Sequence, residues 1–495
     1  MACARPKTGL SYLKLNGPRE RPMRFQRSEG LTASEQVPAE LCDKSFLKLW
    51  TYPNLFRRPG KELTDLLVVF GNDVIIFSDK SCNYPNTGNT DLDWSRWYNH
   101  SIALSAKQIA KTEKCILSNP DKVFLDAKCL QKLPIDLPNA ANMRVHRICV
   151  AVGALDRAQA ETGTRALRIE PSVLNDAVRF TVGTTDKASG WVHVFDEEGL
   201  ATVLSELSTI TDFIHYLNGK VALTQTNFKS AEAETDLLGC YLWHGRTFPA
   251  RDRDYRLEPN LWATVEASKE FLAGREANKG SQFWDGLIEY INDNYLNETL
   301  EFGNQHSMCE HERIMRILAS ETRFHRRVLS KAILHRAEFA KKQAISTLLP
   351  SDQPDVSYVL YIGKGDEGKD HAAYRAGRAK ELQMRCHAAK AVNPEKRFIV
   401  GIALDALGVK GSSEDFICLD TDEWTAEDIQ KAQKMRTELG YFKGGNAILS
   451  RFSEDEYPGS RRAVDVAKLA DELSRLTVTE SVELAAMLKT SWDIS

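Results

Sequence analysis

The sequence predicts a mixed α/β protein, with α+β character, on three observations. Short apolar runs rich in Val, Ile and Phe alternate with longer amphipathic segments along most of the chain. Two of these runs flank Gly71-Asn72-Asp73, a pattern typical of a β-hairpin, because a tight turn needs residues that tolerate positive φ. Finally, the chain has 495 residues, and a single core rarely grows beyond roughly 250 to 300 residues. We therefore expect several domains.

Composition and turn-forming residues divide the chain into five expected segments. A leader rich in Arg, Pro, Gly and Ser cannot bury enough apolar surface to fold alone, and Ser351-Asp352-Gln353-Pro354 marks a later boundary. The segments are a flexible leader (1–38), a first α/β domain (39–155), a middle domain that is mixed and then helical (156–345), a small α/β module (355–445) and a tail with an amphipathic helix (446–495).

Charge and cysteine usage restrict the class of protein. The net charge of −3 argues against a protein that coats nucleic acid through its overall charge, so any such contact must come from local patches. Ten cysteines are scattered without a CxxC pair, which is typical of a reducing compartment and predicts a cytoplasmic protein. No run of 18 apolar residues occurs, so we expect no membrane span.

The predicted hairpin at 61–80 gathers charged side chains at its open end. A two-residue turn on Gly71-Asn72 or on Asn72-Asp73 places Asp65 across from Ser78 or Lys80. Because side chains alternate along a strand, Ser78 and Lys80 point to one face and Asp79 to the other. Glu62, one short step upstream, lies close enough to join the group. The plain alternative is a buried hairpin with solvated charges at its ends.

Carboxylates and a lysine at the mouth of a hydrophobic hairpin are the groups that metal-dependent phosphodiester cleavage needs. Hard carboxylate oxygens hold Mg²⁺, which keeps several waters and lowers the pKa of an attacking water. An ammonium group steadies that water and the developing negative charge.

On Glu62, Asp65 and Lys80 the sequence resembles the PD-(D/E)XK superfamily of restriction-endonuclease-like nucleases. The resemblance covers about a fifth of the chain and implies a restriction-endonuclease-like α/β sandwich that hydrolyses nucleic acid, DNA in preference to RNA, with Mg²⁺ or Mn²⁺. It implies that Asp65 is the principal metal ligand and Glu62 a second, direct or through water. It also implies that Asp79 offers its backbone carbonyl and that Lys80 positions the attacking water.

The sequence departs from the family pattern at Ser78, where an acid is expected two residues before the lysine. Three outcomes follow. Ser78 is a tolerated substitute with a water-mediated metal contact, a one-residue shift of register brings in Asp79, or the site does not cut.

The helix expected at about 93–117 offers candidate substrate contacts. Lys107, Lys111 and Lys114 repeat at helical spacing, with Gln108 beside them. In the resembling nucleases the helix after the active-site hairpin often brings a Gln or Lys to the substrate, which makes Lys107, Gln108 and Lys111 nucleic-acid-binding candidates. A solvated helix face is the alternative.

A second basic helix is expected at about 312–344. It carries nine basic side chains, Arg323, Arg326 and Arg327 among them, which would hold phosphates by charge and bidentate contacts or would pair with acidic helices of the same fold.

Three functional hypotheses follow from the sequence. The first is a Mg²⁺-dependent endonuclease, whose degenerate nuclease domain joined to unrecognised domains looks like bacterial antiviral defence proteins. The second is a nuclease-like protein that no longer cuts but binds nucleic acid or a protein partner. The third is a scaffold or homo-oligomer without nucleic acid. Phosphate binding must weaken steeply as salt rises, so salt dependence separates the third from the others.

Overall fold

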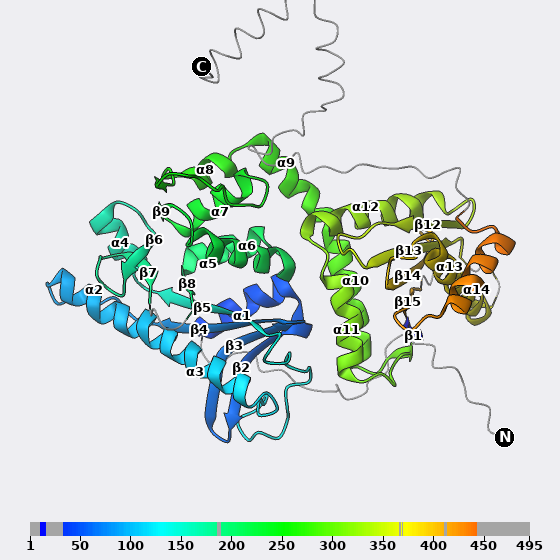
Figure 1. Ribbon diagram of the computed structural model, residues 1–495, viewed down its shortest axis with the longest axis horizontal. Helices are drawn as coiled ribbons and strands as arrows, with labels where there is room; N and C mark the ends of the chain where they lie inside the picture. The colour runs from blue at the N-terminus through cyan, green and yellow to red at the C-terminus, as the bar shows by residue number, and fades with distance from the viewer. Residues whose placement is uncertain are drawn as a thin grey trace, which may run out of the picture.

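The computed structural model describes residues 10–15, 33–185, 190–365, 368, 370–409 and 413–442. Within these ranges the chain has the mixed α/β architecture that the sequence predicts. A five-stranded sheet lies in the N-terminal half, the middle is helical, and a second sheet with helices follows (Figure 1). None of the helices in the described ranges is long and apolar enough to cross a membrane.

The N-terminal sheet is mixed, with the strand order β2-β3-β4-β5-β8. Its strands are β2 (Thr51–Arg58), β3 (Lys61–Phe70), β4 (Asp73–Ser81), β5 (Arg144–Val152) and β8 (Val192–Asp196). The first three form an antiparallel meander, whereas β5 and β8 run parallel to β4. A parallel strand needs a crossover connection, so the last strand of this sheet comes late in the chain. The sheet therefore extends past residue 155, where the sequence placed the end of the first domain.

Helices cover both faces of this sheet. On one face, α2 (Thr90–Tyr98), a π-helical turn η2 (Asn99–Ala103) and α3 (Leu104–Ser118) follow one another, and α3 packs on β4 and β5. On the other face, the ring of Phe213 in α6 (Ile210–Leu223) lies 5.2 Å from that of Phe46 in α1 (Ala33–Phe46) and 6.4 Å from that of Phe195 in β8. A sheet buried on both sides explains why its central strands read as continuous apolar runs.

Short elements and helices make up the middle of the chain. The helix α5 begins after Asp196, whose carboxylate accepts a hydrogen bond of 2.6 Å from the N–H of Gly199 and so caps the helix. These elements are α4 (Leu155–Thr162), β6 (Arg168–Leu174), β7 (Thr181–Thr184), α5 (Glu197–Glu206), β9 (Phe228–Ser230), α7 (Glu234–Trp243), β10 (Tyr255–Arg256), α8 (Leu261–Glu266), α9 (Lys269–Asn278), η3 (Lys279–Ser281), α10 (Gln282–Leu296), α11 (Met308–Ala319) and α12 (Arg323–Phe339). A further short turn, η1 (Lys48–Trp50), directly precedes β2.

The second sheet has the order β11-β1-β15-β14-β13-β12. Its parallel pair, β13 and β14, is joined by the long helix α13, and α14 follows with a capping box formed by Thr425 and Asp428. The elements are β1 (Leu10–Leu15), β11 (Leu300–Phe302), β12 (Ile345–Leu349), β13 (Val356–Gly363), α13 (His371–Val392), β14 (Phe398–Asp405), β15 (Asp415–Asp420) and α14 (Ala426–Leu439).

The structure describes part of the expected leader but does not describe the expected tail. Residues 10–15 pair antiparallel with β15, and α1 already begins at Ala33, so parts of the range 1–38 lie in regular structure instead of a flexible leader. The tail at 446–495 and its expected amphipathic helix lie outside the described residues.

A candidate active site at the β3–β4 hairpin

The hairpin turns on Gly71-Asn72. Phe70 pairs with Asp73 and Leu66 with Phe77, so the two strands are joined by two residues without a slip of register. Gly71 has φ +60°, a conformation that L side chains rarely adopt. Continuing the register by one pair puts Asp65 opposite Ser78. The alternative in which a shifted register brings Asp79 to this face is therefore not the one that the structure adopts.

Asp65 is the centre of the site. Its side chain is buried, with the residue 4 % exposed. Its Oδ2 accepts a 2.8 Å hydrogen bond from the N–H of Asp79 and lies 3.9 Å from Nζ of Lys80. Its Oδ1 accepts a 3.1 Å bond from the side-chain amide of Gln108. Burial raises the pKa of Asp65, and the attraction of Lys80 and these hydrogen bonds offset only part of that effect.

Lys80 connects the site with solvent. Its side chain is 36 % exposed, against 5 % for Asp65, so the ammonium lies where a solvent-borne ligand can reach it. Ser78, two residues earlier on the same face, is completely buried. Ser78 and Lys80 therefore share a face with Asp65, as the sequence predicts.

The other two expected ligands lie differently. Asp79 is 8 % exposed and alternates to the opposite face from Lys80, while its backbone N–H points to Asp65. Glu62 is exposed at the start of β3, beside a register shift, and takes no part in the contacts of Asp65 described above. The carboxylates of Asp79 and Glu62 thus do not join Asp65 in one cluster.

Helix α3 is fastened across the site by two side chains one turn apart. The hydroxyl of Thr112 donates to the carbonyl of Leu63 at 2.5 Å, and Gln108 reaches Asp65 from the preceding turn. Lys107 and Lys111 lie on the exposed side of the same helix. The structure therefore brings Gln108 to the site and leaves the two lysines beside it.

One neighbour was missed by the sequence analysis. Cys149 of β5 pairs with Ser78 of β4 and is fully buried, and burial raises the pKa of its thiol to about 12. It therefore stays a neutral thiol beside Ser78 in the sheet. The parallel pairing that places it there joins residues 71 positions apart, and the local pattern contains no signal for it.

The two most buried arginines of α12 require a correction. Arg323 and Arg326 are 5 % and 1 % exposed, and both bind the carboxylate of Asp285 in α10 at 2.6 Å. Arg326 also donates to the backbone carbonyls of Glu321 and Ala319. A guanidinium enclosed in this way offers no surface to a phosphate, so these two arginines hold helices together and are not nucleic-acid ligands.

Arg327 differs from its two neighbours on α12. Its guanidinium carbon lies 4.9 Å from the ring centroid of Phe324, and Nη1 donates to Asn278 at 3.3 Å. These are partly exposed contacts at the helix surface. The structure therefore leaves Arg327 as a candidate without bringing it to Asp65.

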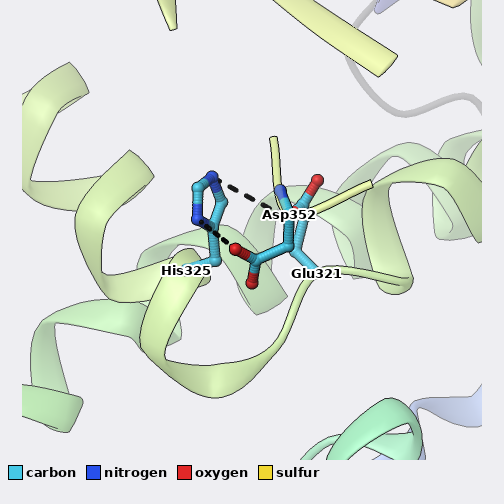
Figure 2. A group of neighbouring side chains, drawn as sticks. All are labelled: Glu321, His325 and Asp352. Atoms are coloured by element: carbon cyan, nitrogen blue, oxygen red, sulfur yellow. Dashed lines mark hydrogen bonds and ion pairs between the residues drawn. The ribbon is translucent and has the colours of Figure 1, made fainter. Parts of the chain in front are cut away.

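A second cluster, of Glu321, His325 and Asp352, has side chains close enough to share a metal ion (Figure 2). Each is already engaged. His325 contacts Asp352 through Nδ1 at 3.0 Å and the carbonyl of Pro350 through Nε2 at 3.0 Å.

Glu321 is similarly occupied by hydrogen bonds. It is completely buried and accepts bonds from Ser351, Gln353 and Tyr358 and from the N–H of Asp352. A cluster whose ligand atoms are used within the chain is a structural junction between α12 and the segment before β13. Comparisons with protein-family models, with curated proteins and with solved structures returned no match.

Proposed function

We propose that the N-terminal sheet carries a metal-dependent nuclease site that hydrolyses phosphodiester bonds, with DNA the favoured substrate. The single observation that carries the proposal is the meeting of Asp65, Lys80 and Gln108 at the open end of one hairpin. A carboxylate, an ammonium and an amide on three different segments converge on one partly exposed point. The same three positions were expected from the resemblance to restriction-endonuclease-like nucleases.

The donor set suits a metal ion that keeps most of its water. Mg²⁺ usually binds one or two protein carboxylates and retains several waters, and Asp65 supplies one carboxylate here. The backbone carbonyl of Asp79 is the second donor that the proposal assigns. When bound, the ion would polarise the phosphate and lower the pKa of a water molecule.

The chain's own residues have separate roles in the proposal. Lys80, with its ammonium at the solvent boundary, binds the attacking water or a phosphate oxygen and balances negative charge. Gln108 fixes the orientation of the Asp65 carboxylate through Oδ1. The N–H of Asp79 fixes Oδ2, which keeps the carboxylate directed along the hairpin edge.

A specific observation favours a second candidate function. Ser78 occupies the position of the expected acid, and the carboxylate of Asp65 lies 3.9 Å from the ammonium of Lys80. A site with one carboxylate that is partly neutralised by its own lysine binds divalent cations weakly. The alternative is therefore a nuclease-like protein that binds nucleic acid or a partner without cutting.

Cleavage of plasmid DNA and of a structured RNA by the purified protein tests the proposal, with Mg²⁺ or Mn²⁺ in one arm and EDTA in the other. Asp65→Asn and Lys80→Gln should each lose cleavage by about 10²-fold or more. Lys269→Gln, an exposed lysine on α9, is the matched control and should cleave like wild type. Thermal melting checks that all variants are folded. Cleavage that survives in Asp65→Asn, or its absence from the wild type, rejects the nuclease.

A further inference from the structure

Three segments next to the candidate site are joined to one another by hydrogen bonds. The loop at 119–133 runs alongside the tip of the β2–β3 hairpin, because Phe56 and Phe124 exchange backbone hydrogen bonds of 2.9 and 2.8 Å and the N–H of Gly60 donates to Ala127 at 2.9 Å. Helix α3 is attached to the other strand of this hairpin, β3, by the bond from Thr112 to Leu63. Figure 1 shows the ends of β2 and β3 together with this loop at one edge of the sheet.

The surface of these segments is strongly basic. Nine exposed cations lie on it, and we call them together the hairpin-tip surface. They are Arg57, Arg58 and Lys61 at the tip, Lys122, Lys128 and Lys132 in the loop, and Lys107, Lys111 and Lys114 on α3.

Few carboxylates balance these cations. The same segments carry Glu62, Glu113, Asp121 and Asp126. Glu113 is bound to Arg147 of β5 at 2.7 Å, and Asp126 is occupied by the backbone N–H groups of its own turn, which lower its pKa. Within the ranges that the structure describes, none of the nine cations forms an ion pair. Exposed cations elsewhere commonly do so, as Lys431 does with Glu427 at 2.8 Å. A chain of net charge −3 thus concentrates unbalanced positive charge at one place.

The distances connect this surface with the candidate site. The stripe from Lys107 to Lys114 is about 10 Å long on a helix, and Gln108 within it contacts Asp65. Along β3, Lys61 at the tip is four residues from Asp65, or about 13 Å. At 3.4 Å per base pair this corresponds to about four steps of a duplex. Cations at the tip would therefore meet phosphates close to a strand bound at Asp65.

We propose that the hairpin-tip surface binds the phosphate backbone of a nucleic-acid duplex and presents it to Asp65 and Lys80. This inference rests on the proposed function and adds that the substrate is a duplex. Proteins that hold single strands stack bases on exposed aromatic rings. The three segments contribute one aromatic residue beyond β2, Phe124, and it is only partly exposed. Charge without stacking platforms is the chemistry of backbone contacts to a duplex.

The test measures binding in EDTA, so that cleavage does not enter. A labelled 20-base-pair DNA duplex is titrated with protein by fluorescence anisotropy between 50 and 200 mM salt. The variant Arg58→Gln/Lys61→Gln/Lys128→Gln removes three cations that have no assigned catalytic role. Its matched control is Lys269→Gln/Lys331→Gln/Lys380→Gln, which removes three exposed lysines on other helices.

The expected result is a weaker and less salt-sensitive complex. Each phosphate contact contributes about 0.9 to the slope of log K against log salt, so the tip variant should lower that slope by about 2 to 3 and lower the affinity at 50 mM salt at least tenfold. The control should bind like wild type. Equal losses in both triple variants, or no loss in the tip variant, would overturn the proposal.

Further arms of the experiment show which form of nucleic acid binds, and they test the nuclease proposal and the surface proposal separately. An RNA duplex of the same length distinguishes RNA from DNA, which share the phosphate chemistry, and tighter binding to either duplex supports the surface. Equal or tighter binding of a single strand overturns the duplex assignment. If the wild type binds through the tip but does not cleave, the nuclease fails and the surface stands. Unchanged binding and cleavage in the tip variant leave the nuclease standing and reject the surface.

Discussion

Nζ of Lys80 lies 3.9 Å from Oδ2 of Asp65 across the open end of the β3–β4 hairpin. The same oxygen accepts the N–H of Asp79, and the partner oxygen accepts Gln108. Despite these partners, burial is the largest influence on Asp65 and raises its pKa. The site therefore holds a carboxylate in an environment that disfavours its charge. Such a buried charge lowers the stability of the fold, and groups of this kind are typical of functional sites, where a ligand binds the charge.

The first prediction concerns this cost. Because the pKa of Asp65 is raised, the folded protein holds the proton more tightly than the unfolded chain. The free energy of unfolding therefore falls as the pH rises from 3.8 through the raised pKa, and ionised Asp65 lowers stability at pH 7. Asp65→Asn should melt at a higher temperature than wild type at pH 7, with a smaller difference at pH 4, while it loses cleavage. A lower melting temperature at pH 7 would contradict this.

The second prediction concerns Gln108. Replacing it by Glu puts a second carboxylate beside Asp65, which raises the pKa of Asp65 further. The rising limb of the cleavage rate against pH should move to higher pH. Replacing it by Leu removes a hydrogen bond that lowers the pKa of Asp65, at a cost of about 1 kcal/mol in stability. This variant should lower the rate and move the limb in the same direction, but by less than Glu does. A profile unchanged in Gln108→Glu would show that Asp65 does not control the rate.

The third prediction restores the missing acid. Ser78→Asp places a carboxylate in a completely buried position next to Asp65. Without metal, the two like charges should lower the melting temperature. With Mn²⁺ the variant should gain stability, because a ligand that binds only the folded state raises the free energy of unfolding with its concentration. A melting temperature that is indifferent to Mn²⁺ in this variant would argue that no cation binds at Asp65.

The hairpin was predictable because its determinants are local. The Gly71-Asn72 turn fixes the register, and alternation along β4 then fixes the face of Ser78 and Lys80. Gln108 was predicted by resemblance, and the bond from Thr112 to Leu63 explains how α3 comes close enough. These contacts join residues within one supersecondary unit.

The prediction that Arg323 and Arg326 bind nucleic acid was wrong because their burial depends on a partner that is distant in the sequence. A count of basic residues on α12 does not distinguish a solvated arginine from one that binds Asp285, which lies 38 and 41 positions away from Arg323 and Arg326. Whether an arginine side chain of α12 is buried depends on which helix packs against it, and this packing is a feature of the tertiary structure. The predicted first domain likewise ended before strand β8. A strand that pairs in parallel is connected by a long crossover, so no nearby turn in the sequence shows that it belongs to the sheet.

The fourth prediction tests the structural role of these arginines. Asp285→Ala leaves two buried guanidinium groups without their shared carboxylate, and removal of one partner from a buried ion pair costs about 3 to 5 kcal/mol. Unfolding in urea should show this loss as a lower midpoint at an unchanged slope. Arg327→Gln is the control on the same helix and should change stability by less than about 1 kcal/mol. A duplex-binding defect in folded Asp285→Ala would count against the assignment.

The fifth prediction concerns His325 in the junction of Figure 2. Burial alone lowers the pKa of this histidine, but Asp352 and Glu321 outweigh it and raise the pKa above 6.5. A raised histidine pKa contributes stability that is fully present below 6.5 and is lost as the pH rises through the raised value. The stability difference between wild type and His325→Gln should therefore be larger at pH 6 than at pH 9, when it is measured by urea unfolding at both values. A bound metal ion would reverse the order, because a ligand histidine must be neutral, so a difference that grows with pH and with added Zn²⁺ would show that the cluster is a metal site after all.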